Sequence, residues 1–314
     1  MSLRGKKRLS ESGKSKIELL FPSAPMLHLA NRELALAILD PTDPADLARQ
    51  GWRYCHGGYV WQVTDAKLGP LVSGPSYPAE PGVYDGQGLP ESFRHTRRDN
   101  FSRLTWRGDT GVAIGAGTIT ASPDPKASAH DSVRLGERCQ WAVTPAADHV
   151  IFQTRQTAAG VSYELTRKIE LAGRTVTSFT QLTNVGDTPL ALQWFPHPFW
   201  ALTEQRAKMQ LPAGTTVPEN GVFMITPDGA LTFKRPFGPK PDNQFALLTL
   251  PPKTPLTLSL NHPALSRVTF ATSFVPSECP VWANAHTVSV EPYLALNLSP
   301  GETRHWHVRH EFKK

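Results

Sequence analysis

Two residues that lie far apart in the sequence, His197 and Glu291, have side chains suited to transferring protons. His197 lies in the segment FPHPF, and the prolines beside it cannot donate hydrogen bonds to a neighbouring strand. The backbone is therefore expected to leave regular pairing there and to fix the direction of the imidazole. Glu291 ends an alternating strand, on the same face as Thr287 and Ser289. A core histidine bonded to the backbone and a solvated carboxylate are the alternative interpretations.

The elements that must carry these residues are β-strands. Apolar and polar residues alternate with period two, and between residues 140 and 184 turns of two to four residues separate the successive runs. Strands with such short connections must be antiparallel neighbours, because parallel pairing needs a long crossover. Helical periodicity is nearly absent, so we predict an all-β fold, one large antiparallel β-sandwich. The predicted strands are 32–40, 57–63, 110–121, 140–144, 149–157, 161–171 and 174–184, followed by 190–195, 245–250, 257–261, 267–273, 286–293 and 305–312.

The distribution of charge divides the 314 residues into a tail and a body. Residues 1–16 contain six basic side chains and one acidic side chain, so they hold +5 of the net charge of +6. This Ser- and Gly-rich start is predicted to be a disordered basic tail, and residues 17–314 to be a single domain. Binding of nucleic acid or an anionic surface is one interpretation of the tail, and simple solubilisation is the other. The nearly neutral body does not favour a nucleic-acid partner. Residues 66–100 are predicted to form an ordered loop over a cleft.

The remaining composition points to a protein without a metal or a membrane span. The cysteines Cys55, Cys139 and Cys279 are isolated, and no spacing typical of a zinc site or a disulfide framework is present. No apolar run reaches 18 residues, and the basic start is not followed by the apolar segment of a secretion signal. We therefore expect a cytoplasmic protein with no zinc site and no disulfide framework.

Two motifs resemble the galactose mutarotase-like, or aldose 1-epimerase, superfamily. In NVGDTPLALQWFPHPFW (184–200), a strand ends in an N-x-(S/G)-D-x-P turn and the next leads to an H-P-(Y/F)-F element. In the segment 286–302, a strand that delivers a glutamate is followed by L-x-P-G-E. The resemblance covers residues 139–312, and residues 51–98 more loosely. It implies the galactose mutarotase-like supersandwich fold.

The resemblance also implies roles for individual residues. His197 would be the general acid at the ring oxygen of a sugar, and Glu291 the general base at the anomeric hydroxyl. Asp242 would bind sugar hydroxyls, although a turn-forming Asp-Asn pair explains it equally well. The aromatic side chains beside His197, with Trp194 among them, offer flat faces for sugar stacking. An arginine and a second histidine usually lie on early strands of the family, and the candidates here are Arg94, His56 and His95.

The implied function is interconversion of the anomers of a free or phosphorylated aldose by acid–base catalysis, with no metal and no redox cofactor. A protonated histidine and an ionised glutamate are expected to coexist near pH 7, because each stabilises the charge of the other. A non-catalytic carbohydrate-binding protein with the same fold is the main alternative. A carbohydrate lyase or hydrolase is a third, but those proteins usually carry an added helical domain. The sequence does not identify the sugar or the oligomeric state.

Overall fold

The computed structural model describes residues 26–94, 105–124, 126–128, 131–202, 207–238 and 242–314. Within these ranges the chain forms twenty-five strands and one four-residue helix, α1 (Pro44–Leu47). Thus the predicted all-β class is confirmed. Asp43 caps α1, and its side chain accepts hydrogen bonds from the backbone N–H groups of Ala45 and Asp46. The predicted basic tail lies outside the described residues, and the domain boundary at residue 17 stays a prediction.

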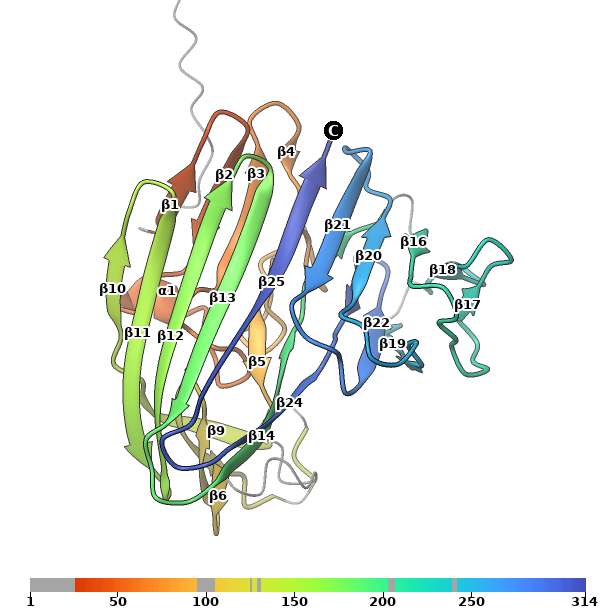
Figure 1. Cartoon of the computed structure of the whole chain (residues 1–314). Coiled ribbons are helices and arrows are strands. Elements are labelled where there is room, and N and C mark those ends of the chain that lie inside the picture. Colours follow the sequence, from red (N-terminus) through yellow and green to blue (C-terminus); the bar gives the residue numbers. More distant parts are fainter. Residues whose placement is uncertain (1–25, 95–104, 125, 129–130, 203–206, 239–241) are drawn as a thin grey trace, which may run out of the picture.

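A ten-stranded antiparallel sheet dominates the molecule, and its long strands cross the front of Figure 1 side by side. Strands β10 to β13 form the predicted meander with the registers that tight turns require. The last strand, β25, then lies between β13 and β21. In order across the sheet, the strands are β10 (Ala142–Pro145), β11 (His149–Ala158), β12 (Val161–Ala172), β13 (Thr175–Asn184), β25 (Thr303–Lys313), β21 (Arg267–Thr272), β20 (Thr257–Leu260), β16 (Met209–Gln210), β18 (Ala230–Phe233) and β17 (Phe223–Ile225).

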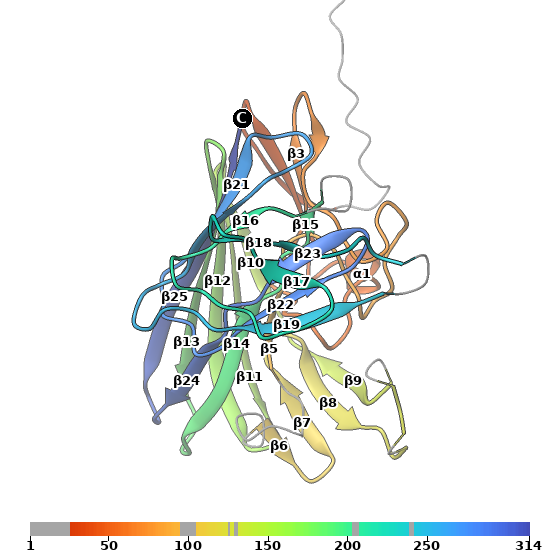
Figure 2. The same ribbon diagram turned by 90° about the vertical axis from the view of Figure 1, so that its right-hand side faces the viewer.

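Four smaller sheets complete the fold, and Figure 2 shows β3 and β23 on the opposite side of the molecule from β25. The first contains β1 (Leu27–Ala30), β2 (Leu34–Ile38), β3 (Val60–Asp65) and β4 (Gly69–Pro70). A second has the order β24 (Leu294–Leu298), β14 (Leu190–Pro196) and β5 (Glu91–Phe93). The third has the order β15 (Trp200–Ala201), β23 (Thr287–Val290), β22 (Cys279–Ala283) and β19 (Gln244–Leu248). The fourth contains β6 (Trp106–Arg107), β7 (Thr110–Ala113), β8 (Gly117–Ala121) and β9 (Val133–Arg138).

The core lies between the large sheet and the smaller sheets. Strand β12 buries every second side chain along most of its length, which is the pattern of a strand with one face in the core. Large aromatic side chains join the layers: the ring of Trp200 packs on Phe270, and that of Trp194 on Trp306. Full burial of one such side chain contributes about 1.5–3 kcal/mol, so these contacts hold the sheets face to face.

Backbone hydrogen bonds between the smaller sheets fix the segments that follow β14 and β23. The N–H of His197 donates to Pro90 O (2.8 Å), and the N–H of Glu291 donates to Pro280 O (2.8 Å). The N–H of Phe199 reaches Gly88 O, also at 2.8 Å. Gly88 has φ of 78°, and a Cβ there would lie 2.4 Å from Val60 O, so only glycine fits.

Candidate functional site

The structure brings His197 and Glu291 into direct contact. Nε2 of His197 lies 3.2 Å from Oε1 of Glu291, although the two residues are 94 positions apart. Both are nearly enclosed, with 3% and 6% of their surface exposed. The imidazole and the carboxyl group therefore share one small site, as expected, but they touch each other directly.

Strand β23 places a third polar side chain, Ser289, in the same site. Its Oγ lies 3.2 Å from Nδ1 of His197, and its hydroxyl acts on the Glu291 carboxyl group to lower the pKa of that group. Residues two apart on a strand point to the same face, and the prediction that Ser289 and Glu291 share a face is confirmed. Both ring nitrogens of His197 thus have partners that one short segment supplies.

Aromatic rings surround the imidazole of His197. The Phe199 ring lies closest, with its centroid 4.6 Å from that of the imidazole, and Phe195 lies at 6.4 Å. Tyr54 and Trp282, from two other parts of the chain, are each 6.0 Å away. The apolar rings exclude water from the histidine and fix the plane of its ring.

Arg53 supplies a positive charge that acts on the pair. Its guanidinium lies over the rings of Tyr54 and Tyr84, at 4.9 and 4.6 Å, and donates to Tyr84 O at 3.3 Å. It acts electrostatically on both His197 and Glu291. Arg53, Tyr54 and Trp282 were not predicted from the sequence. The only available signal was the basic and aromatic composition of the segment WRY (52–54), just before the candidate His56.

Burial keeps the pair uncharged near pH 7, and the Arg53 charge adds to this effect on His197 but opposes it on Glu291. Loss of hydration raises the pKa of Glu291 to about 8, although Arg53 and the Ser289 hydroxyl act in the opposite direction. Desolvation, and then the repulsion of Arg53, lower the pKa of His197 well below its ordinary value. The expected pair of imidazolium and carboxylate is therefore replaced by a neutral imidazole beside a protonated carboxyl group, because neither group retains the water that would stabilise its charge.

The raised pKa of Glu291 gives the pair a pH-dependent stability. Because the folded-state pKa of about 8 lies above the ordinary 4.5, the protonated carboxyl group stabilises the fold fully below about pH 4.5. That contribution is lost as the pH rises toward and through 8. Replacing Glu291 with glutamine is therefore expected to raise stability relative to the wild type at pH 9, by up to about 4 kcal/mol, but much less at pH 5. Urea unfolding at the two pH values measures this, and an equal difference at both would contradict it.

Two other predicted residues lie near other partners. Asp242 accepts hydrogen bonds from Arg235 (Nη1, 2.6 Å) and from the Gly238 N–H (2.9 Å), which explains it as the anchor of its own loop. Arg94 donates to Gln193 Oε1 (2.9 Å), and its guanidinium lies 5.4 Å from the centroid of the Tyr293 ring. Glu291 and Arg94 both act electrostatically on Tyr293, so Arg94 stands at the border of the site. Asp242 has no contact with the site in the described structure.

The remaining predicted residues do not join the pair. His56 is fully buried, its Nε2 lies 2.8 Å from Gly51 O, and desolvation lowers its pKa to about 4. Trp194 is also fully buried, and its ring packs on Phe274 and Trp306 in the core. It therefore has no free face for a sugar, and we leave it out of the candidate site. His95 lies outside the described residues.

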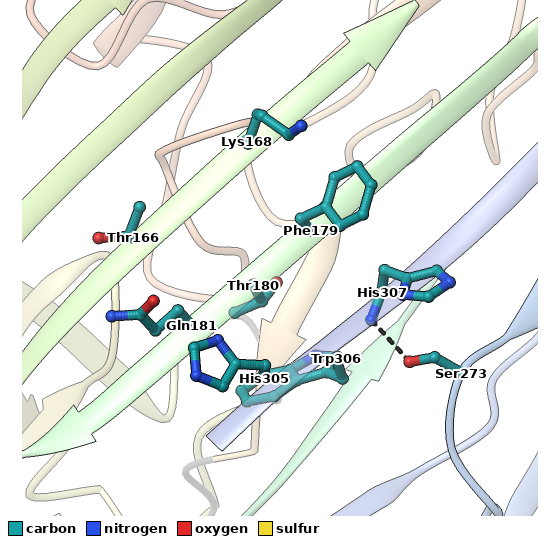
Figure 3. Close-up of a pocket in the computed structure, with 9 residues that line it drawn as sticks. All are labelled: Thr166, Lys168, Phe179, Thr180, Gln181, Ser273, His305, Trp306 and His307. Atoms are coloured by element: carbon teal, nitrogen blue, oxygen red, sulfur yellow. Dashed lines mark hydrogen bonds between the residues drawn. The ribbon is translucent and has the colours of Figure 1, made fainter. Parts of the chain in front are cut away.

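An open depression of about 360 Å³ lies elsewhere, on the outer face of the large sheet (Figure 3). Its centre is a row of paired side chains, Lys168, Phe179 and His307, on β12, β13 and β25. The ammonium of Lys168 lies 4.3 Å from the centroid of the Phe179 ring, and the His307 ring lies 5.3 Å away. Lys168 and His307 thus already cover the Phe179 ring, which is the usual arrangement on a sheet face that is exposed to solvent.

Among the described residues, no group of three His, Cys, Asp or Glu side chains stands close enough together to hold a metal ion. The three cysteines are buried and unbonded to one another. No helix of the described chain is long and apolar enough to cross a membrane.

Comparison with known proteins identifies the fold. No family model and no curated protein matches the sequence. Among solved structures, a galactose mutarotase related enzyme from Lactobacillus acidophilus superposes with a TM-score of 0.60 at 12% identity, over 92% of this chain and 98% of that one. A galactose mutarotase-like protein from Lactobacillus casei gives 0.55 at 14% identity, over 91% and 99%. One from Clostridium acetobutylicum gives 0.54 at 12% identity, over 91% and 94%. The chain therefore has the galactose mutarotase-like fold, as the two sequence motifs predicted.

Proposed function

We propose that this protein interconverts the anomers of an aldose, as an aldose 1-epimerase-type isomerase. The contact of His197 with Glu291, at 3.2 Å in a ring of aromatic side chains, carries this proposal. Mutarotation needs an acid at the ring oxygen and a base at the anomeric hydroxyl, and these two oxygens are bonded to the same carbon. Two proton-transfer groups in contact with each other match that spacing. The structural neighbours, a galactose mutarotase related enzyme and galactose mutarotase-like proteins, support the same reaction class.

The residues of the site have distinct roles in this proposal. Ionised Glu291 takes the proton of the anomeric hydroxyl while Nε2–H of His197 gives a proton to the ring oxygen, so that the ring opens. The aldehyde rotates about its bond to the neighbouring carbon, and the ring closes on the other face with the two roles exchanged. Each positioned group contributes on the order of 10²–10⁴-fold to the rate.

The surroundings of the pair support a sugar as the substrate. The indole of Trp282 is only partly buried and stands 6.0 Å from the imidazole, where the C–H face of a pyranose can stack on it. The guanidinium of Arg53 can donate several hydrogen bonds to hydroxyl groups. Arg94, beside Tyr293, is a second cation that would favour a phosphorylated aldose over a neutral one. No metal or redox cofactor takes part in this mechanism.

The proposal is tested by following anomer exchange directly. Freshly dissolved α-glucose, α-galactose and α-glucose 6-phosphate would each be mixed with the protein, and formation of the β-anomer measured with a β-specific oxidase or dehydrogenase. A rate that rises in proportion to protein concentration, for at least one sugar, is expected. Exchange at the spontaneous rate for a panel of common aldoses and their phosphates would contradict the proposal.

The near-complete burial of the pair favours one alternative, a carbohydrate-binding protein without catalysis. Such a protein would hold a sugar at the Arg53 and Trp282 side of the site without bringing it to His197. Calorimetric binding of a sugar together with an unchanged rate of anomer exchange would select this alternative.

A further inference from the structure

Three side chains that can donate or accept protons lie together in the site. His197 meets Glu291 through Nε2 (3.2 Å) and Ser289 through Nδ1 (3.2 Å). Ser289 lies two residues before Glu291 on the same strand face, and its hydroxyl acts to lower the pKa of the Glu291 carboxyl group. Each contact can hold its hydrogen on either side, since a hydroxyl both donates and accepts and a neutral imidazole has one donor and one acceptor. Ser289 itself is fully buried, so water does not compete for these bonds.

This environment makes an imidazolium a poor resting state. His197 is enclosed by aromatic rings, and the guanidinium of Arg53 repels a second positive charge at this place. A neutral imidazole that simply gave away its Nε2 proton would become an anion, which burial disfavours even more. Acid catalysis by His197 therefore needs a source that returns a proton to Nδ1 as Nε2 loses one.

We propose that Ser289 is a proton relay between Glu291 and Nδ1 of His197, so that the imidazole acts as an acid by changing its tautomer and not by losing a positive charge. The inference rests on the proposed mutarotase function and assigns Ser289 a part in it. Ser289 acts through its two neighbours and does not touch the sugar.

The protons and electrons of ring opening balance without any external reactant. Ionised Glu291 takes the anomeric hydroxyl proton, and the electrons of that O–H bond form the carbonyl. Glu291 passes a proton to Ser289 Oγ as the serine gives its own proton to Nδ1 of His197. The Nε2 proton goes to the ring oxygen, which takes the electron pair of its broken bond to the anomeric carbon. Glu291 ends ionised again, His197 ends neutral with its hydrogen on Nδ1, and ring closure runs the same steps backwards.

The relay is tested with Ser289→Ala, Ser289→Thr and a matched control. Ser73→Ala is the control, because the buried Ser73 hydroxyl donates only to the backbone oxygen of His286 among the described contacts. Ser289→Ala is expected to lower kcat for anomer exchange about 100-fold with KM changed less than threefold. Ser289→Thr keeps the hydroxyl, so its kcat should lie within about tenfold of the wild-type value. The kcat of Ser73→Ala should equal the wild-type value.

The pH profile separates a relay from a merely structural serine. With the relay, the wild-type rate should rise as Glu291 ionises and then stay level up to about pH 10, since no imidazolium is needed. Ser289→Ala should instead lose its residual rate on the alkaline side, because only an imidazolium can then supply the proton. The other titratable or charged groups facing Glu291 have pKa values raised beyond their ordinary ranges, so they do not titrate in this window: Arg53, Tyr54, Cys279 and Tyr293.

The outcomes distinguish the relay from the function on which it rests. An active wild type with an alkaline decline of its own would overturn the relay without any variant, even if Ser289→Ala failed to fold. The relay would also be overturned if the wild type were active and Ser289→Ala had the same rate and the same pH profile. A wild type without any acceleration would contradict the proposed function, and the relay would fall with it because it would have no reaction to serve.

Discussion

Replacing Glu291 with glutamine is expected to lower the rate of anomer exchange by about 10²–10⁴-fold, the usual contribution of a positioned general base. Glutamine has the same shape, and its amide can still hydrogen-bond Nε2 of His197, so the site should keep its packing. What is lost is the carboxylate that takes the anomeric proton. The measurement is kcat for the sugar that the wild type accelerates most, at a pH of 8.5 or above, where the wild-type carboxyl group is ionised.

Glu302→Gln is the matched control for this substitution. The Glu302 carboxylate accepts the Ser299 N–H (3.0 Å) and pairs with Arg304 (3.0 Å) in the turn before β25, away from the pair. It should change the rate by less than twofold, while both variants retain the circular dichroism spectrum of the wild type. Wild-type kinetics in Glu291→Gln would remove Glu291 from the mechanism. An equal loss in both variants would point to a general effect of removing a carboxylate.

The alternating segments of the sequence predicted the strands because each buries one face. Strands β11, β12 and β13 carry that signal over ten or twelve residues and were predicted almost to their ends. Strands β9, β22 and β24 are among the strands that were not predicted. Strand β22 is buried on both faces for most of its length, so it shows no alternation to read. The place of β25 between β13 and β21 is a long-range pairing that local patterns do not encode.

The site could be predicted only where local sequence patterns mark it. His197 and Glu291 each stand beside a proline at the end of a strand, and the resemblance of both motifs to one superfamily joined them. Arg53 follows no strand pattern and comes to the pair from 144 residues before His197. Strand β14 buries both of its faces near its end, so the sequence could not show that Trp194 faces the core. Likewise, the local ion pair of Asp242 with Arg235 depends on a loop conformation.

A buried ion pair lies next to the site and is expected to control its stability. Nη2 of Arg167 on β12 lies 2.7 Å from Oε2 of Glu91 on β5, and only 1% and 4% of these side chains are exposed. Nη2 of Arg167 also donates to Ser178 Oγ at 2.7 Å. Burial raises the pKa of Glu91 while the Arg167 charge acts to lower it. In addition, Glu91 pairs with Pro196, directly before His197.

Removing one partner of this pair leaves the other charge buried without compensation. Glu91→Ala is therefore expected to lower the free energy of unfolding by about 3–5 kcal/mol, as measured by urea denaturation at pH 7. Glu91→Met combined with Arg167→Met removes both charges and fills similar volume, so it should recover most of that loss. The exposed pair of Arg155 with Glu164, at 2.9 Å on the same large sheet, is the control, and Glu164→Ala should cost no more than about 1 kcal/mol. A Glu91→Ala effect as small as that of the control would show that water or a shifted neighbour compensates Arg167. In that case the charge pair would not be what holds β5 against the large sheet beneath the His197 segment.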